Sequence, residues 1–425
     1  MEKKKTEKAW VITTDMGYGH QRASYPLRDL APDNKVISAN AYDSIPSDDV
    51  DTWERGKKFY DFVSKFKSIP LLGDLIFGIF DFFQRILSFY PKRDLTKPNL
   101  TLKQYYKLIS KGWGKHLIGK LGEKDLPIIA TFFISAFMAE EFNYSNEIYC
   151  QACDTDVARI WAPLNSKKSR INYFAPTERV KERLMLYGVN EANIYLTGFP
   201  LPERNLEHLK EDLKNRLVNL DPKGRYRDQY YDLIESRLGN LPLESDHPLT
   251  LMFAVGGAGA QSEIGIQIIK NLKSRIKNGE IRIILVAGTH KNVKEHFEKQ
   301  IKKLGLEQVI GEKIKIIYRK EINDYFEEFN KILRKTDILW TKPSELSFYS
   351  ALGIPLILAP TIGSQEDFNK RWILKSGFGN TQKNPLYTDQ WLFSWIDKGY
   401  LAEFAMEGYV EGRQDAVKKI KKIVS

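Results

Sequence analysis

Two series of short apolar runs alternate with helical stretches along this chain, and that alternation most constrains its fold. The first series comprises Trp10–Thr14, Lys35–Ala39, Pro127–Thr131, Glu147–Gln151, Ile171–Phe174 and Asn193–Thr197. The second comprises Leu249–Val255, Ile281–Val286, Ile314–Tyr318, Asp337–Trp340 and Pro355–Ala359. Strands that alternate with helices are typical of α/β folds with parallel sheets. The pattern therefore predicts two doubly wound α/β halves.

The length and the polar stretch between the two series predict the domain boundaries. At 425 residues the chain is too long for one ordinary core. We expect a first domain over residues 1–200, an interdomain connection over 201–247, a second domain over 248–385 and C-terminal helices over 386–425. Two such halves leave a cleft between the carboxyl ends of their sheets.

The net charge of +11 favours an acidic partner, such as a phosphorylated substrate, an anionic lipid surface or nucleic acid. No nucleic acid is expected, because the chain has no helix-turn-helix or RNP-like motif. Neither a signal peptide nor an uncharged run of about 18 residues is found, so we expect a cytoplasmic protein without a transmembrane helix. Cys150 and Cys153 form a CxxC pair that lacks further ligands for zinc.

Residues 69–90 interrupt the α/β rhythm with a dense apolar and aromatic run. On a helix, only Asp74, Gly78, Asp81, Arg85 and Ser88 form a narrow polar stripe. Such a helix is either a core helix of the first domain or an amphipathic helix at a membrane interface. The lysines on either side favour an anionic membrane surface. Candidate membrane contacts are Phe80, Phe82, Phe83 and Phe89.

The segment Asp15-Met-Gly-Tyr-Gly-His20 follows the first apolar run and precedes a short predicted helix that ends near Leu30. Gly17 and Gly19 permit a sharp turn and a close approach of a ligand. His20 supplies a group that takes a proton near pH 7. Arg22 stands where a dinucleotide fingerprint needs its third glycine, which argues against a nicotinamide site.

Further motifs follow in order along the chain. They are Cys153-Asp-Thr-Asp156, Phe253-Ala-Val-Gly-Gly-Ala-Gly-Ala-Gln261, Leu285-Val-Ala-Gly-Thr-His290, Thr336-Asp-Ile-Leu-Trp-Thr-Lys-Pro343 and Pro360-Thr-Ile-Gly-Ser-Gln-Glu-Asp-Phe-Asn369. With the glycine loop, they resemble the GT-B glycosyltransferases of the monogalactosyldiacylglycerol synthase and processive diacylglycerol glucosyltransferase type. The peptidoglycan N-acetylglucosaminyltransferase is a more distant relative. The resemblance runs from about Trp10 to Gly379.

This resemblance implies a fold and a reaction. The fold is GT-B, with two Rossmann-like domains that face each other across a cleft. The first domain binds the acceptor, here a membrane-associated lipid, and the second binds a nucleotide sugar, here a UDP-sugar. The enzymes invert the anomeric centre without a metal or another cofactor. The last helix, at Asp415–Val424, would cross back to the first domain, and the protein would associate peripherally with the membrane.

The resemblance also implies roles for single residues. His20 matches the family's histidine at the catalytic cleft and is the first candidate for the base or for positioning the sugar. Asp154 and Asp156 match a family motif in which one aspartate acts as or orients the base, although helix capping or a turn explains them equally. The expected donor-binding residues are Gly256, Gly257, Gly259, Gly288, Thr289, Lys342, Glu345, Gln365, Glu366 and Asn369.

One segment departs from the family pattern. Where the family has Lys-Pro-Gly-Gly, this chain has Lys342-Pro-Ser-Glu345, and the stretch up to Pro355 is two residues shorter. The family's ribose-binding carboxylate falls at Ser350 or Phe348, depending on the side from which the stretch is aligned. Glu345 is a shifted substitute, but a carboxylate there repels phosphate.

Three other functions therefore stay open. They are a GT-B enzyme with a soluble acceptor, a nucleotide-sugar epimerase, and a degenerate module that binds a sugar nucleotide or a partner without catalysis.

Overall fold

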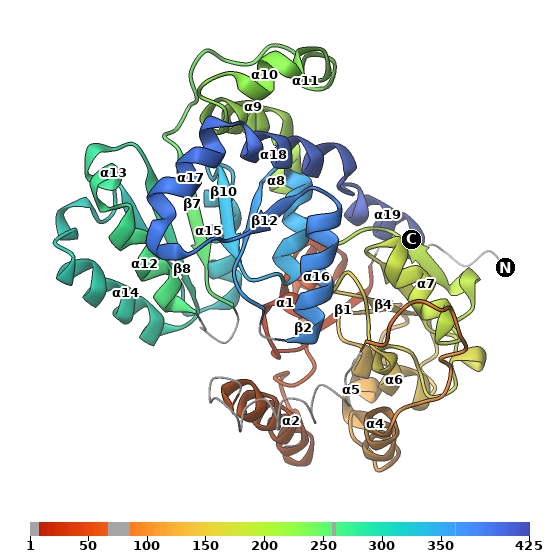
Figure 1. The fold of residues 1–425 in the computed structure, drawn as a ribbon. Coiled ribbons are helices and arrows are strands. Elements are labelled where there is room, and N and C mark those ends of the chain that lie inside the picture. Colours follow the sequence, from red (N-terminus) through yellow and green to blue (C-terminus); the bar gives the residue numbers. More distant parts are fainter. Residues whose placement is uncertain (1–7, 67–85, 257–260, 362) are drawn as a thin grey trace. The chain divides into compact units, whose positions relative to one another are not determined.

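The computed structural model describes residues 8–66, 86–256, 261–361 and 363–425 (Figure 1). These residues form two units. The first consists of Met1–Leu201, Ile362–Asn369 and Asp415–Ser425, and the second of Pro202–Thr361 and Lys370–Gln414. Each unit contains one six-stranded parallel sheet with helices packed against it. The predicted pair of Rossmann-like domains, the building blocks of the GT-B fold, is confirmed.

The first sheet has the strand order β2-β1-β3-β4-β5-β6. Its strands are β1 Trp10–Thr13, β2 Ile37–Ser38, β3 Ile128–Ala130, β4 Ile148–Gln151, β5 Asn172–Ala175 and β6 Ile194–Leu196. The helices of this unit are α1 Tyr18–Ser24, α2 Ser47–Phe66, α4 Leu100–Ser110, α5 Lys115–Leu121, α6 Phe133–Glu141, α7 Glu178–Leu186 and α19 Ala416–Val424. The direction of winding reverses between β1 and β3, which makes this the switch point of the sheet.

The second sheet has the order β12-β11-β10-β7-β8-β9. Its strands are β7 Thr250–Ala254, β8 Arg282–Gly288, β9 Ile314–Tyr318, β10 Ile338–Thr341, β11 Leu356–Leu358 and β12 Gly379–Thr381. Its helices are α8 Glu203–Glu207, α9 Leu209–Leu220, α10 Arg225–Gln229, α11 Tyr231–Leu238, α12 Ser262–Asn271, α13 Lys273–Asn278, α14 Lys291–Lys303, α15 Ile322–Leu333, α17 Thr388–Asp397 and α18 Tyr400–Glu411. Here the switch point lies between β7 and β10.

Each apolar run of the sequence forms a strand, because a strand buried on both faces needs a continuous apolar sequence. The strand β12 was not predicted, since its sequence Gly379-Asn-Thr381 is short and polar. The predicted helix from His20 to Leu30 begins two residues earlier, at Tyr18, and continues from Tyr25 to Leu30 as a 3₁₀ helix. Pro26 lies at this change of helix type and has no backbone N–H to donate.

The units also differ from the predicted boundaries. The stretch 201–247, expected as an interdomain connection, forms α8–α11, and residues such as Leu213 and Leu217 belong to the core of the second unit. Helix α16, Ser364–Lys375, is shared, because its residues up to Asn369 cluster with the first unit. The stretch 201–247 has a polar sequence because its helices are amphipathic and bury only one face. That polar character led to the prediction of a connection.

Helix α19 belongs to the first unit. Val417, Ile420 and Val424 are buried in one core cluster with Val11 of β1 and Leu27. The hydroxyl of Tyr149 donates a hydrogen bond of 3.5 Å to the carbonyl of Ile423. The last residues of the chain are therefore part of the core that supports the first sheet (Figure 1).

Most of the predicted helix 69–90 lies outside the described residues, as do the candidate membrane contacts Phe80, Phe82 and Phe83. Its last part does not fit the prediction, because Ile86–Tyr90 have no regular secondary structure. Phe89 is half-buried, and the guanidinium of Arg179 lies 3.6 Å from the centre of its ring. A cation stacked on the ring accounts for this side chain without a membrane.

Candidate functional site

The glycine loop connects β1 to α1 at the switch point of the first sheet. Gly17 has a φ of 108°, which a residue with a side chain rarely adopts, and nothing lies within 4 Å of where its Cβ would be. The backbone N–H of Asp15 donates to the Asn40 side chain at 2.9 Å, which fixes the loop to the end of β2. Gly19 lies in the first turn of α1. The loop is therefore held in place and has open space beside Gly17.

His20 connects the two strands that flank the switch point. Its Nδ1 lies 2.7 Å from the carbonyl oxygen of Thr131, the residue that follows β3. A carbonyl only accepts, so Nδ1 carries the proton and Nε2 presents a lone pair. The ring of Phe132 meets the imidazole edge-on, with 4.7 Å between ring centres. This arrangement fixes both the tautomer and the orientation of the ring.

Burial lowers the pKa of His20 to about 4, and the bond to the Thr131 carbonyl opposes this shift only in part. The imidazole is therefore neutral at pH 7. A neutral imidazole with a fixed Nδ1–H and an available Nε2 lone pair has the form that a general base requires.

The two aspartates of the Cys153–Asp156 loop have different surroundings. Asp156 is buried and accepts two hydrogen bonds from Arg183, at 2.9 Å and 2.8 Å, and a third from the backbone N–H of Val157. Burial raises the pKa of Asp156, and the facing guanidinium opposes this shift. Because both oxygens of Asp156 are bound by Arg183, its geometry is that of a structural anchor.

Asp154 lies one residue outside that anchor and is only half-buried. It accepts a hydrogen bond of 2.9 Å from the side-chain amide of Asn369. The oxygen of the same Asn369 side chain accepts from the backbone N–H of Thr155 at 2.9 Å and from its hydroxyl at 2.8 Å. Asn369 is buried, and it therefore acts as a clamp that holds the start of α16 against the Asp154 loop.

The clamp brings further predicted residues to the same side of the first unit. Gln365 and Glu366 precede Asn369 by four and three residues on α16, so all three share one helix face. Cys153 and His20 meet at one acceptor, because the Cys153 thiol lies 3.5 Å from the same Thr131 carbonyl that His20 binds. His20 and Cys153 are thus linked through Thr131, and the next residue after Cys153, Asp154, is linked to the start of α16 through Asn369.

In the second unit, Gly256 and Lys342 meet at the other switch point. Gly256 follows β7, and Lys342 follows the neighbouring β10. A Cβ at Gly256 would lie 2.3 Å from Cε of Lys342, so the lysine side chain occupies the space that the missing Cβ leaves. Gly257 and Gly259 lie outside the described residues. Helix α12 begins at Ser262, close to its predicted start at Gln261.

Gly288 ends β8, beside β7, and Thr289 follows it. Gly288 has a φ of 65°, so the chain turns there in a conformation that favours glycine. Both residues lie at the same carboxyl edge of the second sheet as Gly256 and Lys342, because all these strands are parallel. The second unit thus presents a lysine and tight turns at the position where α/β sheets bind ligands.

The segment that departs from the family pattern is packed into the core. Glu345–Leu352 forms the 3₁₀ helix η7, all of whose residues are buried. The Ser350 hydroxyl donates to the Ser347 carbonyl at 2.8 Å, and Phe348 packs on Trp372 with 5.4 Å between ring centres. Ser350 and Phe348, the two positions aligned with the family's ribose-binding carboxylate, carry no carboxylate. Glu345, the shifted substitute, is only 9% exposed.

Sequence reasoning missed several residues of these sites. Thr131, Phe132, Asn40 and Thr155 orient the predicted residues, but they are ordinary loop residues by type. Their position within four residues of the end of a strand was the available signal, since such residues converge at the carboxyl edge of a parallel sheet. No group of three or more metal-ligating side chains occurs among the described residues. In the same part of the chain, no helix is long and apolar enough to span a membrane.

Comparison with known proteins supports the resemblance of the motifs. Residues 237–371 match a family described as a domain of unknown function (DUF6938), which covers less than half of the chain. The chain is 23% identical over 221 residues to the processive diacylglycerol beta-glucosyltransferase of Bacillus subtilis (strain 168), covering 52% of this chain and 46% of that enzyme. The match therefore spans less than half of that relative's length.

A second relative has a longer match. The enzyme of the same name from Staphylococcus epidermidis is 21% identical over 307 residues, covering 71% of this chain and 67% of the relative.

Two solved structures are similar at a coarse level. UDP-GlcNAc 2-epimerase from Neisseria meningitidis, bound to UDP-GlcNAc, has a TM-score of 0.47 at 14% identity and covers 78% of this chain and 83% of its own. MurG from Acinetobacter baumannii has a TM-score of 0.44 at 12% identity, covering 79% and 81%. At these values, neither structure informs the chemistry of this chain.

Proposed function

We propose that this chain is a glycosyltransferase that moves a sugar from a UDP-sugar to a membrane-associated lipid acceptor, with inversion and without a metal ion. The observation that carries the proposal is the His20–Thr131 hydrogen bond at the switch point of the first sheet. It gives the first unit an oriented, neutral base. The relatives named diacylglycerol glucosyltransferases support the lipid acceptor and the sugar-transfer reaction.

The proposed reaction assigns one task to each group. Nε2 of His20 takes the proton of the acceptor hydroxyl as its oxygen attacks the anomeric carbon of the donor. The bond from that carbon to the UDP oxygen breaks, and the diphosphate leaves with the bonding electrons. Lys342 and the turn at Gly256 bind this diphosphate, because a cation and close backbone stabilise the developing charge.

Sugar recognition is assigned to the start of α16. Gln365 and Glu366 present an amide and a carboxylate, the groups that suit sugar hydroxyls, on the helix face that Asn369 fixes. Asp154 is the residue that orients this face. Asp156 is assigned the structural role that its pair with Arg183 supports.

A panel of UDP-sugars, offered with diacylglycerol in mixed vesicles, tests the proposal. We expect one donor to be consumed with formation of a glycolipid, and UDP to raise the melting temperature. If no donor is consumed while UDP still protects the protein from unfolding, the proposed activity is wrong and a sugar-nucleotide-binding module takes its place. A soluble acceptor would be revealed by turnover that does not depend on vesicles.

The binding module is the second candidate function, and the buried helix η7 favours it. In place of a glycine loop, this chain has a helix whose side chains all pack inward. Among the described residues of the second unit, UDP binding would then depend on Lys342, Gly256, Gly288 and Thr289. Lys342→Ala is expected to abolish UDP protection under both functions, whereas loss of turnover on changing His20 is expected only of the enzyme.

A further inference from the structure

Helices α4 and α5 of the first unit lie in a stretch with an unusual charge pattern. Residues 95–122 contain six lysines and neither aspartate nor glutamate: Lys97, Lys103, Lys107, Lys111, Lys115 and Lys120. All six side chains are exposed. Asp94 and Glu123 border this stretch, but the six lysines outnumber them, so the surface attracts a partner of negative charge.

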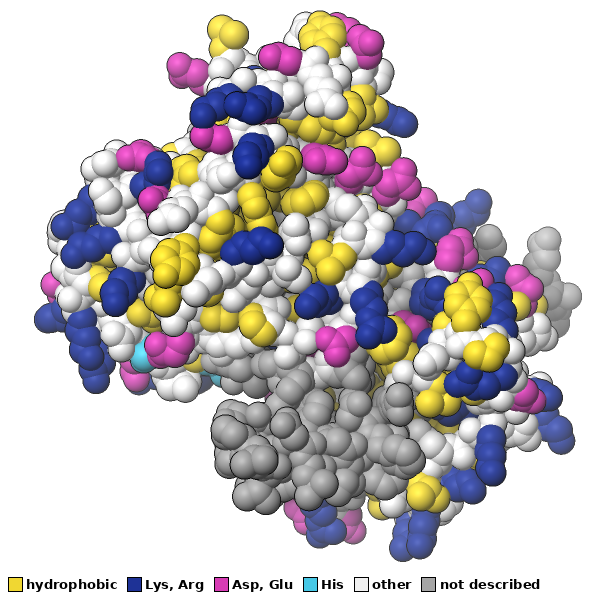
Figure 2. Space-filling model, in the orientation of Figure 1, with side chains coloured by type: hydrophobic (Ala, Val, Ile, Leu, Met, Phe, Trp, Pro, Cys, Tyr) yellow, Lys and Arg dark blue, Asp and Glu magenta, His cyan; other side chains and the backbone are white. Residues whose placement is uncertain are grey.

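The exposed face of α4 also carries large apolar side chains. Leu100 is 62% exposed and Leu108 is 38% exposed. Lys103 and Lys107 lie on the same side of the helix and Lys111 directly follows its end, while the opposite side, with Leu102 and Ile109, is buried. Figure 2 shows Lys and Arg side chains beside hydrophobic ones over the lower right of the molecule, to the right of the residues drawn in grey.

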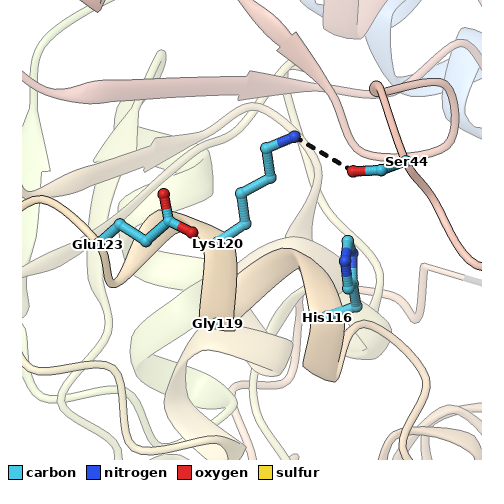
Figure 3. A pocket seen from close by; sticks show the side chains of 5 residues that line it. All are labelled: Ser44, His116, Gly119, Lys120 and Glu123. Carbon is cyan, nitrogen blue, oxygen red and sulfur yellow. Dashed lines mark hydrogen bonds between the residues drawn. The ribbon is translucent and has the colours of Figure 1, made fainter.

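A polar hollow of about 420 Å³ opens beside α5 and is lined by Ser44, His116, Gly119, Lys120 and Glu123 (Figure 3). Nζ of Lys120 lies 3.4 Å from the Ser44 hydroxyl and donates to the Asp43 carbonyl at 3.0 Å. Nδ1 of His116 lies 2.9 Å from the Tyr42 hydroxyl. The hollow thus gathers one ammonium, one imidazole and one hydroxyl, which are groups that bind phosphate, together with the carboxylate of Glu123, which opposes binding.

We propose that the α4–α5 face docks the chain on an anionic phospholipid bilayer, with Leu100 and Leu108 entering the interface and the hollow holding one phosphate headgroup. Charge complementarity identifies the occupant, because the stretch pairs six lysines with exposed leucines and contains no acid. The docking face is separate from the predicted segment 69–90. It deepens the proposed function by naming the surface, and its test needs no turnover.

Charge reversal tests the α4 side of the proposal. Lys103→Glu with Lys107→Glu is compared with Lys299→Glu and Lys303→Glu on α14, which changes the net charge equally in the second unit. We expect the wild type to sediment with phosphatidylglycerol–phosphatidylcholine vesicles at 0.1 M salt, and binding to weaken as salt rises. The α4 variant should bind at least about ten-fold more weakly, and the α14 variant should resemble the wild type.

Gly119 tests the hollow. Nothing lies within 4 Å of its Cβ position, so a side chain fits there without strain. Gly119→Glu places a carboxylate in the hollow and should weaken binding, whereas Gly119→Ala, the matched control, should not. Glu123→Gln removes the one acidic side chain that lines the hollow and should strengthen binding.

Three outcomes overturn the proposal. Equal loss in the α4 and α14 variants would indicate attraction by net charge alone. Binding to pure phosphatidylcholine vesicles, unaffected by Leu100→Gln with Leu108→Gln, would place the contact elsewhere. Vesicle binding by Gly119→Glu that equals wild-type binding would show that the hollow does not contact the membrane. Glycosyl transfer to a detergent-solubilised acceptor, measured in parallel, separates failure of docking from failure of the proposed enzyme function.

Discussion

His20 is the residue on which the proposed chemistry depends, and the structure adds its orientation. Its Nδ1 is bound to a carbonyl, its ring edge meets Phe132, and burial lowers its pKa to about 4. A histidine at an ordinary pKa would be partly protonated at neutral pH, whereas the lowered pKa keeps His20 neutral and also makes it a weaker base. The fold therefore makes His20 a neutral base across the physiological range.

The first prediction concerns the pH dependence of this base. Because the pKa of His20 in the folded protein is about 4, kcat/KM should stay level down to about pH 5 and fall below that pH. An ordinary histidine would instead make kcat/KM fall near pH 6.5. His20→Gln keeps a polar side chain but removes the base, and kcat should drop about 10²- to 10⁴-fold. UDP protection should persist. A kcat/KM profile that falls near pH 6.5 would show that the base titrates at an ordinary pKa, and unchanged kcat in His20→Gln would show that His20 is not the base.

Asn369 carries the second prediction, because one amide makes three hydrogen bonds to the Asp154 loop. Asn369→Asp keeps the acceptors but places a carboxylate against Asp154. We expect the free energy of unfolding to fall by about 2–3 kcal/mol at pH 8, and part of the loss to be recovered at lower pH as one carboxyl takes a proton. Urea unfolding at both pH values measures this effect.

The matched control for that clamp is Thr155→Val, which removes the hydroxyl bond and leaves the backbone N–H bond intact. It should lower the free energy of unfolding by only about 1 kcal/mol, without pH dependence. If Asn369→Asp behaved identically at both pH values, repulsion with Asp154 would be excluded.

At the scale of elements, the 3₁₀ helix η7 explains where the family pattern is lost. It ends at Gly353, whose φ is 65°, and it packs closely against α18. A Cβ at Gly408 of α18 would lie 2.3 Å from the carbonyl oxygen of Ser350. The two helices touch through backbone at this point, so the position tolerates no side chain.

This contact gives the third prediction. Gly408→Ala should destabilise the second unit by about 1–3 kcal/mol, because the added methyl meets backbone that cannot move freely. Helix propensity alone predicts that Gly408→Ala stabilises the protein, because alanine favours a helix more than glycine does. Gly56→Ala on α2 is the control, since no atom lies within 4 Å of its Cβ position, and it should stabilise by about 0.5–1 kcal/mol. Thermal unfolding of both variants distinguishes packing from propensity.

At the scale of the whole molecule, the chain begins and ends in the same unit. Helix α19 buries Val417, Ile420 and Val424 against β1 and Leu27, and Lys421 pairs with Asp29 at 2.5 Å. The core of the first unit therefore includes the last residues of the chain, whereas the second unit ends at Gln414.

The fourth prediction follows from this connectivity. Ile420→Ala should lower the free energy of unfolding of the first unit by about 2–4 kcal/mol and leave the second unit unchanged. Hydrogen exchange measured by mass spectrometry should show faster exchange in β1 and unaltered exchange in β7. Lys418→Ala, on the exposed side of α19, should change neither. Faster exchange in both sheets would mean that the units unfold together.

The sequence by itself determined the strands, because burial on both faces demands apolar residues and that demand is local. It also placed Gly17 and His20 on one loop, and Gly256 and Lys342 after strands, since motif spacing is a property of the chain. These features sufficed to predict that the chain folds into two Rossmann-like domains.

Only the tertiary structure decided how the predicted site residues divide their tasks. In the structure Asp156 is hydrogen-bonded to Arg183 and Asp154 to Asn369, although both aspartates stand in one four-residue motif. It also assigned the start of α16 and the last helix to the first unit. These outcomes depend on contacts between residues more than 200 positions apart, such as Asp154 with Asn369 and Tyr149 with Ile423, where geometry selects the hydrogen-bond partner and burial shifts the pKa.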